Sequence, residues 1–248
     1  KADKMTRDRF LARSTVRVPA RELYHWHLRP GAFERLSPPW EGVRVVERSG
    51  PVGEGARVVL SVPMGPFTKR WVAVHRDFVD GSEFKDEQES GPFAEWVHTH
   101  RAVEVDDARS ILEDDIEYVL PLGPPGRLFG GALTRSKLER MFAYRHAVTV
   151  GDNERHAQYA DRPRQTVALT GASGLVGSAL AAFLSTGGHR VLRLVRRPPA
   201  SEDEIRWDPS AGTVDAARLE GVDAVIHLAG SNIASGRWNP SRKAAIRD

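Results

Sequence analysis

The stretch TGASGLVGSALAAFL, residues 170–184, decides the fold of the second part of this 248-residue chain. Three glycines, Gly171, Gly174 and Gly177, follow the apolar run QTVALT at residues 165–170 with the spacing G-x-x-G-x-x-G. The first glycine of such a pattern permits a tight turn, the second lets the backbone approach a pyrophosphate, and the third allows close packing of helix on strand. With an apolar strand before it and an apolar helix after it, the pattern predicts a phosphate-binding turn at a helix N-terminus.

The groups of this glycine-rich turn are the predicted phosphate ligands. The first N–H groups of the following helix have no partner within the helix and face a bound phosphate, and a serine hydroxyl in the turn adds a donor. A tight turn that binds nothing is the alternative interpretation. The predicted contact residues are Gly171, Ser173, Gly174, Leu175, Val176 and Gly177.

Two arginines, Arg196 and Arg197, end the next apolar run, HRVLRLV at residues 189–195. A carboxylate at this place would bind the ribose hydroxyls of NAD, whereas a guanidinium pairs with a 2′-phosphate. The sequence therefore predicts NADP(H) in preference to NAD(H), with a pair of ligand-free surface arginines as the alternative. A further strand, GVDAVIHLAG, ends in a small-residue turn that we expect to line the adenosine and ribose side of the cofactor through Leu228, Ala229 and Gly230.

Composition excludes several classes of protein. The chain has no cysteine, which excludes disulfides and thiolate chemistry and favours a cytoplasmic location. Its net charge is only +3, and its arginines are interrupted by acids, so we expect no nucleic-acid partner. No apolar run approaches the ~18 residues of a membrane span, and the polar start KADKMTRDRF is not a signal peptide.

The first part of the chain follows a different pattern from the second. Strand, two short helices, six strands and a long helix from residue 127 to about 148 are expected in that order, with short turns between them. This order predicts an α+β domain over residues 1–150, with helices on one side of an antiparallel sheet. The polar, proline-containing residues 151–163 predict a linker, and residues 164–248 an α/β parallel sheet.

Aromatic and imidazole side chains alternate on two of the predicted strands. Trp96, His98 and His100 share one strand face, and Trp71 and His75 share a face of a neighbouring strand. We interpret these five residues as a candidate ligand pocket, and hydrogen-bonded core histidines are the alternative. Three nearby imidazoles could also bind a metal, but no carboxylate or cysteine stands at a diagnostic spacing, so no metal ligand is assigned. Asp86 and Asp114 could partner a histidine only if the fold brings them there.

Two stretches of the first part, FKDEQESGPFAEWVHTH at residues 84–100 and DDIEYVLPLG at residues 114–123, resemble START-like helix-grip domains of the SRPBCC, polyketide cyclase-like superfamily. That resemblance implies a long C-terminal helix packed against a curved sheet, with a cavity for a small apolar ligand beneath it.

The second part resembles the atypical, epimerase-type branch of the extended short-chain dehydrogenases/reductases. The matching motifs are TGASGLVG, VRR at residues 195–197, WDP at residues 207–209 and HLAGSNIASGRW at residues 227–238. Members of this NAD-dependent epimerase/dehydratase-like branch are often called nucleoside-diphosphate-sugar epimerases, and some carry an N-terminal START-like domain. The resemblance implies a Rossmann-type domain and a small-molecule substrate, apolar or a nucleotide sugar.

The same resemblance implies a Tyr-x-x-x-Lys pair for proton and hydride transfer. The last tyrosine is Tyr159, before the glycine-rich turn, and Lys243 is the only lysine after it, so no catalytic residue is assigned. The parallel sheet is also incomplete, because a second βαβαβ half is missing. We expect the chain to be a piece of a longer protein; a natural loss of the catalytic half is the alternative.

The sequence thus predicts an NADP(H)-dependent oxidoreductase or sugar-nucleotide epimerase with a fused ligand-binding domain, whose present chain alone is inactive. The competing hypothesis is a ligand-binding or NADP-sensing regulatory protein without turnover.

Overall fold

The computed structural model describes residues 7–230 and 237–247 of the chain. The chain divides into two compact units, residues 1–162 and residues 163–248. Within the described residues, the elements of the first unit are β1 (Asp8–Val16), α1 (Ala20–Leu28), α2 (Ala32–Leu36), β2 (Arg44–Arg48), β3 (Arg57–Met64), β4 (Phe67–Val79), β5 (Glu83–Ser90), β6 (Glu95–Asp106), β7 (Arg109–Val119) and α3 (Gly123–Ala157).

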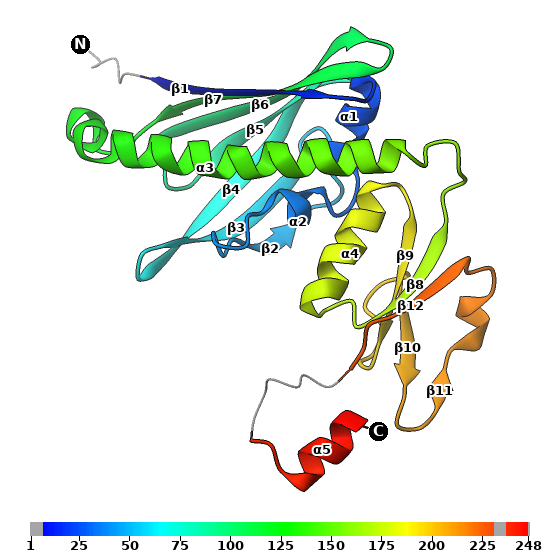
Figure 1. The fold of residues 1–248 in the computed structure, drawn as a ribbon. Helices are drawn as coiled ribbons and strands as arrows, with labels where there is room; N and C mark the ends of the chain where they lie inside the picture. Colours follow the sequence, from blue (N-terminus) through cyan, green and yellow to red (C-terminus); the bar gives the residue numbers. More distant parts are fainter. Residues whose placement is uncertain (1–6, 231–236, 248) are drawn as a thin grey trace. The chain divides into compact units, whose positions relative to one another are not determined.

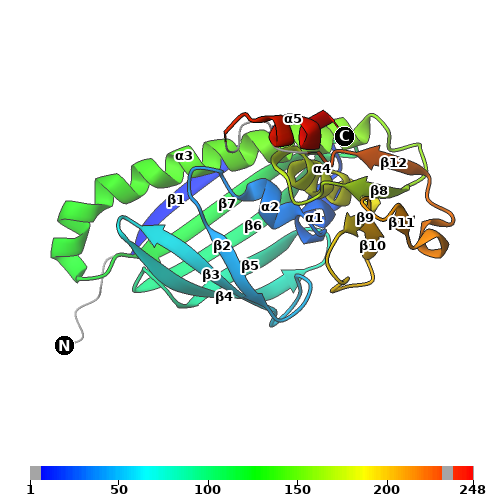
Figure 2. The same cartoon turned by 90° about the horizontal axis from the view of Figure 1, so that it is seen from below.

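The first unit is built on one antiparallel sheet with the strand order β1-β7-β6-β5-β4-β3-β2. Helix α3 runs alongside β1 and against the sheet, as Figure 1 and, from below, Figure 2 show. Two short helices, α1 and α2, follow β1, where Pro19 precedes the first and a left-handed Gly31 precedes the second. The order of elements is the one expected from the sequence, and the unit is a START-like antiparallel sheet with a long helix.

Aromatic side chains fill the space between the sheet and α3. Phe142 of α3 is 1% exposed and packs on Phe10 of β1, with ring centroids 5.4 Å apart. Trp96 and Tyr118 come from neighbouring strands and join the same cluster, together with Leu138 of α3. Burial of this apolar surface fixes one face of α3 against the sheet.

The predicted linker at residues 151–163 is wrong in its first half. Helix α3 continues through residue 157, and Asp152, Asn153 and His156 are buried there. Asp152 accepts two hydrogen bonds of 2.7 Å from the guanidinium of Arg35, a residue of α2. Asn153 donates to the carbonyl oxygen of Thr149 at 2.8 Å. Part of the polar composition that suggested a linker therefore belongs to buried helical residues, one of which, Asp152, has its partner far away in the sequence.

The second unit contains a mixed sheet with the order β11-β10-β9-β8-β12. Strands β12, β8, β9 and β10 pair in parallel, and the two-residue β11 pairs antiparallel with β10. Its described elements are β8 (Thr166–Thr170), α4 (Leu175–Thr186), β9 (Arg190–Val195), β10 (Glu204–Asp208), β11 (Thr213–Val214), η1 (Ala216–Leu219), β12 (Ala224–His227) and α5 (Pro240–Arg247). Residues 231–236, part of the motif at residues 227–238, lie outside the described residues.

Candidate functional site

A cavity of about 470 Å³ lies in the first unit. Its wall is mostly apolar and comes from the segment around α1 and α2, from strands β2 to β6 and from α3. All five residues of the predicted pocket line it: Trp71, His75, Trp96, His98 and His100. A volume of this size suits a small organic molecule.

Strand alternation and register bring these side chains to one face. Residues two apart on a strand point to the same side, so Trp96, His98 and His100 of β6 form a row. The ladders place His98 opposite Asp86 on β5, and His100 opposite Asp114 on β7. Pairing of three strands therefore converts distant sequence positions into one cluster of imidazoles and carboxylates.

Asp114 is the centre of this cluster. It is 3% exposed and accepts hydrogen bonds from Nε2 of His98 at 2.7 Å and from Nε2 of His146, on α3, at 2.9 Å. Nδ1 of His100 lies 2.9 Å from the same carboxylate. The Nδ1 atom of His146 lies 2.8 Å from the hydroxyl of Ser14 on β1, so the cluster joins the sheet to the helix.

Asp86 extends the cluster toward the cavity wall. One of its oxygens accepts a hydrogen bond from Nε2 of His100 at 3.1 Å, and the other lies 3.2 Å from Nε2 of His75. Nδ1 of His75 donates to the carbonyl oxygen of Ala56 at 3.0 Å. The Asp86 side chain is 26% exposed and lines the cavity, so its carboxylate is accessible to a molecule bound there.

Two neighbouring histidines of the cluster, His98 and His100, have pKa values shifted in opposite directions. Burial lowers the pKa of His100, but its hydrogen bonds to Asp114 and Asp86 outweigh burial and raise it to about 9. For His98, burial and the neighbouring charge of His100 lower the pKa to about 4. Burial alone would raise the pKa values of Asp86 and Asp114, yet the hydrogen bonds from the histidines hold both pKa values well below the usual range. Near neutral pH the wall thus holds a protonated imidazole beside a neutral one, a pair that can donate and accept a proton.

Arg145 of α3 is a further polar group on the cavity wall. Its Nε donates to the carbonyl oxygen of Leu36 at 3.1 Å, and the guanidinium carbon lies 5.1 Å from the centre of the Phe142 ring. Burial lowers the pKa of this guanidinium. From the sequence, Asp86 and Asp114 were only possible partners of a histidine, and Arg145 and His146 had no role in the site, because only the strand register and the path of α3 show that these residues converge.

The glycine-rich turn of the second unit has no room for a side chain at Gly171 or at Gly177. Gly171 has φ +68°, and a Cβ atom there would lie 2.6 Å from the backbone of Leu228. A Cβ atom on Gly177 would lie 2.1 Å from the carbonyl oxygen of Gly171, well inside van der Waals contact. Helix α4 begins at Leu175, directly after Gly174, and Leu175 is 91% exposed. The turn is therefore packed closely against the backbone at Gly171 and Gly177, whereas the N-terminus of α4 is open to solvent.

The turn after β12 lies beside the glycine-rich turn. The backbone N–H groups of Leu228 and Ala229 both donate to Oγ1 of Thr170, at 3.0 and 3.1 Å. A Cβ atom on Gly171 would also lie 2.7 Å from the backbone nitrogen of Ala229. Gly230 follows with nothing within 4 Å of the place where its Cβ would be. The predicted contact residues of the two turns thus lie at one end of the parallel strands, and Ser173 is exposed there.

The two arginines after β9 have different surroundings. The guanidinium of Arg197 donates to both carboxylate oxygens of Glu204, one of them at 2.7 Å, and to the carbonyl oxygen of Pro198 at 3.0 Å. The side chain of Arg196 is exposed and forms no ion pair with any residue that the structure describes. Sequence analysis treated the two as equivalent, whereas in the structure only Arg196 has a guanidinium without a carboxylate partner among the described residues.

No helix within the described residues is both long enough and apolar enough to cross a membrane.

Two protein families match the chain, one in each unit. The family described as polyketide cyclase / dehydrase and lipid transport matches residues 16–142. The NAD dependent epimerase/dehydratase family matches residues 167–248.

Curated relatives match the second unit. The epimerase family protein Mb2239 of Mycobacterium bovis is 50% identical over 82 residues, which are 33% of this chain and 27% of that protein. The human epimerase family protein SDR39U1 is 37% identical over 75 residues, 29% of this chain and 24% of its own length. The chain therefore spans about a quarter of the length of these relatives.

One solved structure matches nearly the whole chain. A nucleoside-diphosphate sugar epimerase from Corynebacterium glutamicum is 32% identical with a TM-score of 0.75, covering 96% of this chain and 48% of that one. Norcoclaurine synthase from Thalictrum flavum is 14% identical with a TM-score of 0.51, over 62% of this chain and 99% of its own, which shows a shared fold for the first unit.

Proposed function

Because this chain belongs to the polyketide cyclase / dehydrase and lipid transport family, and joins such a domain to an epimerase-family domain, we propose that it is part of an NADP(H)-dependent oxidoreductase or epimerase with a fused small-molecule-binding domain. The second unit binds the cofactor, and the first unit binds an apolar or amphipathic molecule in its cavity.

The single observation that carries the cofactor proposal is the close backbone packing at Gly171 and Gly177 around the start of α4. The absence of a Cβ atom at Gly171 and Gly177 lets the turn pack directly against its own backbone, and the exposed start of α4 directs free N–H groups outward. A helix N-terminus with such a turn attracts a pyrophosphate through hydrogen bonds and the helix dipole. The parallel order of β10, β9, β8 and β12 supports a Rossmann-type arrangement, in which ligands bind at the carboxyl ends of the strands.

Selectivity for the phosphorylated cofactor rests on Arg196. Its exposed guanidinium follows β9, where the adenosine ribose of a bound dinucleotide lies in this kind of fold. A 2′-phosphate offers it a charge-assisted partner, whereas two ribose hydroxyls do not. Arg197 supports the loop through Glu204 and is less available to a ligand.

The chain's own residues bind and orient the cofactor. When bound, NADP(H) supplies a nicotinamide ring that takes or gives a hydride. The backbone of residues 171–177 holds the pyrophosphate, Arg196 holds the 2′-phosphate, and the backbone of residues 228–230 lines the adenosine side. No tyrosine follows the glycine-rich turn, so a Tyr-x-x-x-Lys pair is missing from this chain. We therefore expect this chain to bind NADPH without oxidising it.

The ligand of the first unit is proposed from the cavity wall. Apolar side chains form most of the wall, and the polar groups gather at the imidazole–carboxylate cluster and Arg145. Such a wall suits a mainly apolar molecule with a polar end, which the cluster orients. A domain of this kind would deliver or retain the substrate of the fused oxidoreductase. The lack of cysteine supports a reducing compartment such as the cytoplasm for the protein.

A fluorescence titration of the purified chain with NADPH tests the proposal. We expect saturable binding of one NADPH per chain and no NADPH oxidation with a panel of aldehydes and ketones. A lack of saturable binding would refute the cofactor role.

The second candidate is a ligand-binding or NADP-sensing protein without turnover, which the missing Tyr-x-x-x-Lys pair favours. The full protein from which such a chain comes separates the two. Oxidation of NADPH by the full protein supports the enzyme, and binding without oxidation supports the sensor.

A further inference from the structure

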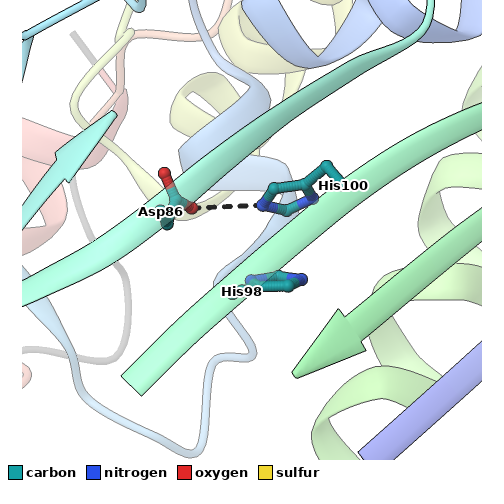
Figure 3. Close-up of side chains that lie close together, drawn as sticks. All are labelled: Asp86, His98 and His100. Atoms are coloured by element: carbon teal, nitrogen blue, oxygen red, sulfur yellow. Dashed lines mark hydrogen bonds and ion pairs between the residues drawn. The ribbon is translucent and has the colours of Figure 1, made fainter. Parts of the chain in front are cut away.

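We propose that Asp86, His98 and His100 form a binding site for a divalent transition-metal ion, open to the cavity of the first unit. Each of these residues offers one donor atom, and the three donor atoms lie within 4.8 Å of one another. Figure 3 shows the three side chains gathered together, with Asp86 hydrogen-bonded to His100. This inference is independent of the nucleotide proposal, because the two concern different units.

Backbone pairing holds the donors in place before any ion arrives. His98 and His100 stand two apart on β6, and Asp86 on β5 is paired in register with His98. A metal with bonds of about 2.0–2.2 Å needs neighbouring donors about 3.4 Å apart. The donor atoms lie within 4.8 Å of one another, so binding an ion requires side-chain movements on the order of an ångström.

A carboxylate already orients the histidines. Metal-binding imidazoles commonly donate their second N–H to a carboxylate, which fixes the ring and raises its basicity. Nε2 of His98 donates to Asp114 at 2.7 Å, and Nδ1 of His100 lies 2.9 Å from the same group. Among the described residues, nothing hydrogen-bonds to Nδ1 of His98, which leaves that nitrogen for a ligand. Asp114 is therefore a positioning residue for this site.

The surroundings also favour a cation. Asp86 and Asp114 face His100 from two sides, and two carboxylates around one imidazole attract positive charge. An ion bound at Nε2 of His100 replaces the proton that this nitrogen donates to Asp86, and that proton is released to solvent. The Oδ1 atom of Asp86 is buried and accepts no hydrogen bond in the described structure, although His75 lies 3.2 Å from it. An ion would satisfy this oxygen.

The donor set selects the class of ion. Two imidazoles and one carboxylate suit Zn²⁺, Fe²⁺ or Co²⁺, whereas Mg²⁺ and Ca²⁺ prefer oxygen ligands. Three protein ligands leave at least one coordination position free, as in metal sites that bind a substrate or water. All three residues line the cavity, so an oxygen atom of a cavity ligand can take that position.

Equilibrium dialysis and calorimetry of the tag-free 248-residue chain with Zn²⁺ test the site, with Mg²⁺ as the comparison ion. We expect one Zn²⁺ per chain and no Mg²⁺ binding in the same concentration range. Asp86→Asn and His100→Gln should each weaken Zn²⁺ binding at least tenfold, and Asp114→Asn about tenfold or more. His27→Gln is the matched control, because His27 lines the same cavity and its ring lies 5.7 Å from His100, yet it is outside the donor set.

Thermal melting of each metal-free variant establishes whether it folds. If Asp86→Asn or His100→Gln does not fold, His98→Gln takes its place in the Zn²⁺ titration. Unchanged Zn²⁺ affinity in folded Asp86→Asn and His98→Gln would overturn the site, as would an equal loss in His27→Gln. Visible absorption of the Co²⁺-loaded chain adds a readout of the free position. We expect acetohydroxamate, an oxygen chelator, to shift the Co²⁺ bands in the wild type; a spectrum that does not change would overturn the claim that the site is open.

Discussion

Single atoms decide the chemistry of the two candidate sites. At the glycine-rich turn the decisive feature is a missing Cβ atom, because Gly177 lies against the carbonyl oxygen of Gly171. In the cavity wall the decisive feature is the placement of charged neighbours, since hydrogen bonds to Asp114 and Asp86 raise the pKa of His100, whereas burial and the charge of His100 lower the pKa of His98. The same residue type therefore has different protonation on one strand, two positions apart.

Gly177→Ala should disrupt the turn of the second unit. The added Cβ would lie 2.1 Å from a backbone oxygen, so the strand and α4 must separate, at a cost of roughly 1–3 kcal/mol in the free energy of unfolding. We expect NADPH binding to weaken at least tenfold in a fluorescence titration. Gly151→Ala, at an exposed position of α3 in the first unit, is the control, because its Cβ would meet nothing within 4 Å and it lies outside the proposed cofactor site. Equal NADPH affinity in wild type and Gly177→Ala would contradict the close packing of the turn.

His27 should make the first unit acid-sensitive. Burial, together with the charge of His100, lowers the pKa of His27 to about 4, while His98 and Asp114 also face it and Leu23 accepts from its Nδ1. The unfolded chain binds a proton near the ordinary pKa of about 6.5, so this contribution to stability is present above that pH and is lost as pH falls toward 4. Urea unfolding at several pH values measures this loss in the free energy of unfolding.

The expected loss between pH 6.5 and pH 4 from this residue is on the order of 2–3 kcal/mol in the free energy of unfolding. In His27→Gln the slope of stability against pH should become shallower over that interval. A variant with the same slope as the wild type would show that His27 is not the neutral buried group described.

The sequence predicted which side chains share a surface wherever a local pattern, such as strand alternation, sets the direction of each side chain. Alternation on β6 placed Trp96, His98 and His100 together, and all three line the cavity. The partners Asp86, Asp114 and His146 were not assigned, because their approach depends on strand register and on how α3 crosses the sheet. Arg196 and Arg197 are equivalent in the sequence, and only the position of Glu204 distinguishes them.

Among the elements, α3 connects most of the features of the first unit. It carries Leu138 and Phe142 into the core, Arg145 into the cavity wall and His146 into the cluster around Asp114. Helical spacing predicted this helix, but not its end, because the polar residues after position 150 resemble a loop in composition. Their burial depends on partners such as Arg35, which is far away in the sequence.

Asp152→Asn should destabilise the contact between α3 and α2. Asp152 is 6% exposed at its side chain and accepts two hydrogen bonds from Arg35, so the substitution removes a charge partner from a mostly buried guanidinium. We expect the free energy of unfolding to fall by about 2 kcal/mol in urea denaturation.

The control for this change is Glu139→Gln on the same helix, whose ion pair with Arg135 is more than half exposed and should contribute nothing measurable. A loss of stability no larger in Asp152→Asn than in Glu139→Gln would contradict a structural role for the buried pair.

The chain consists of two compact units of different construction, an antiparallel sheet with a cavity and a long helix, and a mixed sheet in the part that matches the NAD dependent epimerase/dehydratase family. Composition and motif order predicted this sequence of folds, because antiparallel strands with short turns and alternating strands and helices differ in local pattern. The content of the cavity could not be predicted in this way, since its wall comes from α1, α2, five strands and α3 together. The Tyr-x-x-x-Lys pair is missing from the printed sequence, so binding of the cofactor can be measured on this chain separately from turnover.

Cofactor preference of the wild type and Arg196→Ala, measured by titration with NADPH and NADH, tests the proposed function most directly. Arg193→Ala, which changes an exposed arginine on β9, the strand that precedes Arg196, serves as the matched control. We expect the wild type to bind NADPH about tenfold or more tightly than NADH, and Arg196→Ala to lose that preference through weaker NADPH binding alone. Tighter binding of NADH by the wild type, or unchanged NADPH affinity in Arg196→Ala, would contradict recognition of the 2′-phosphate by Arg196.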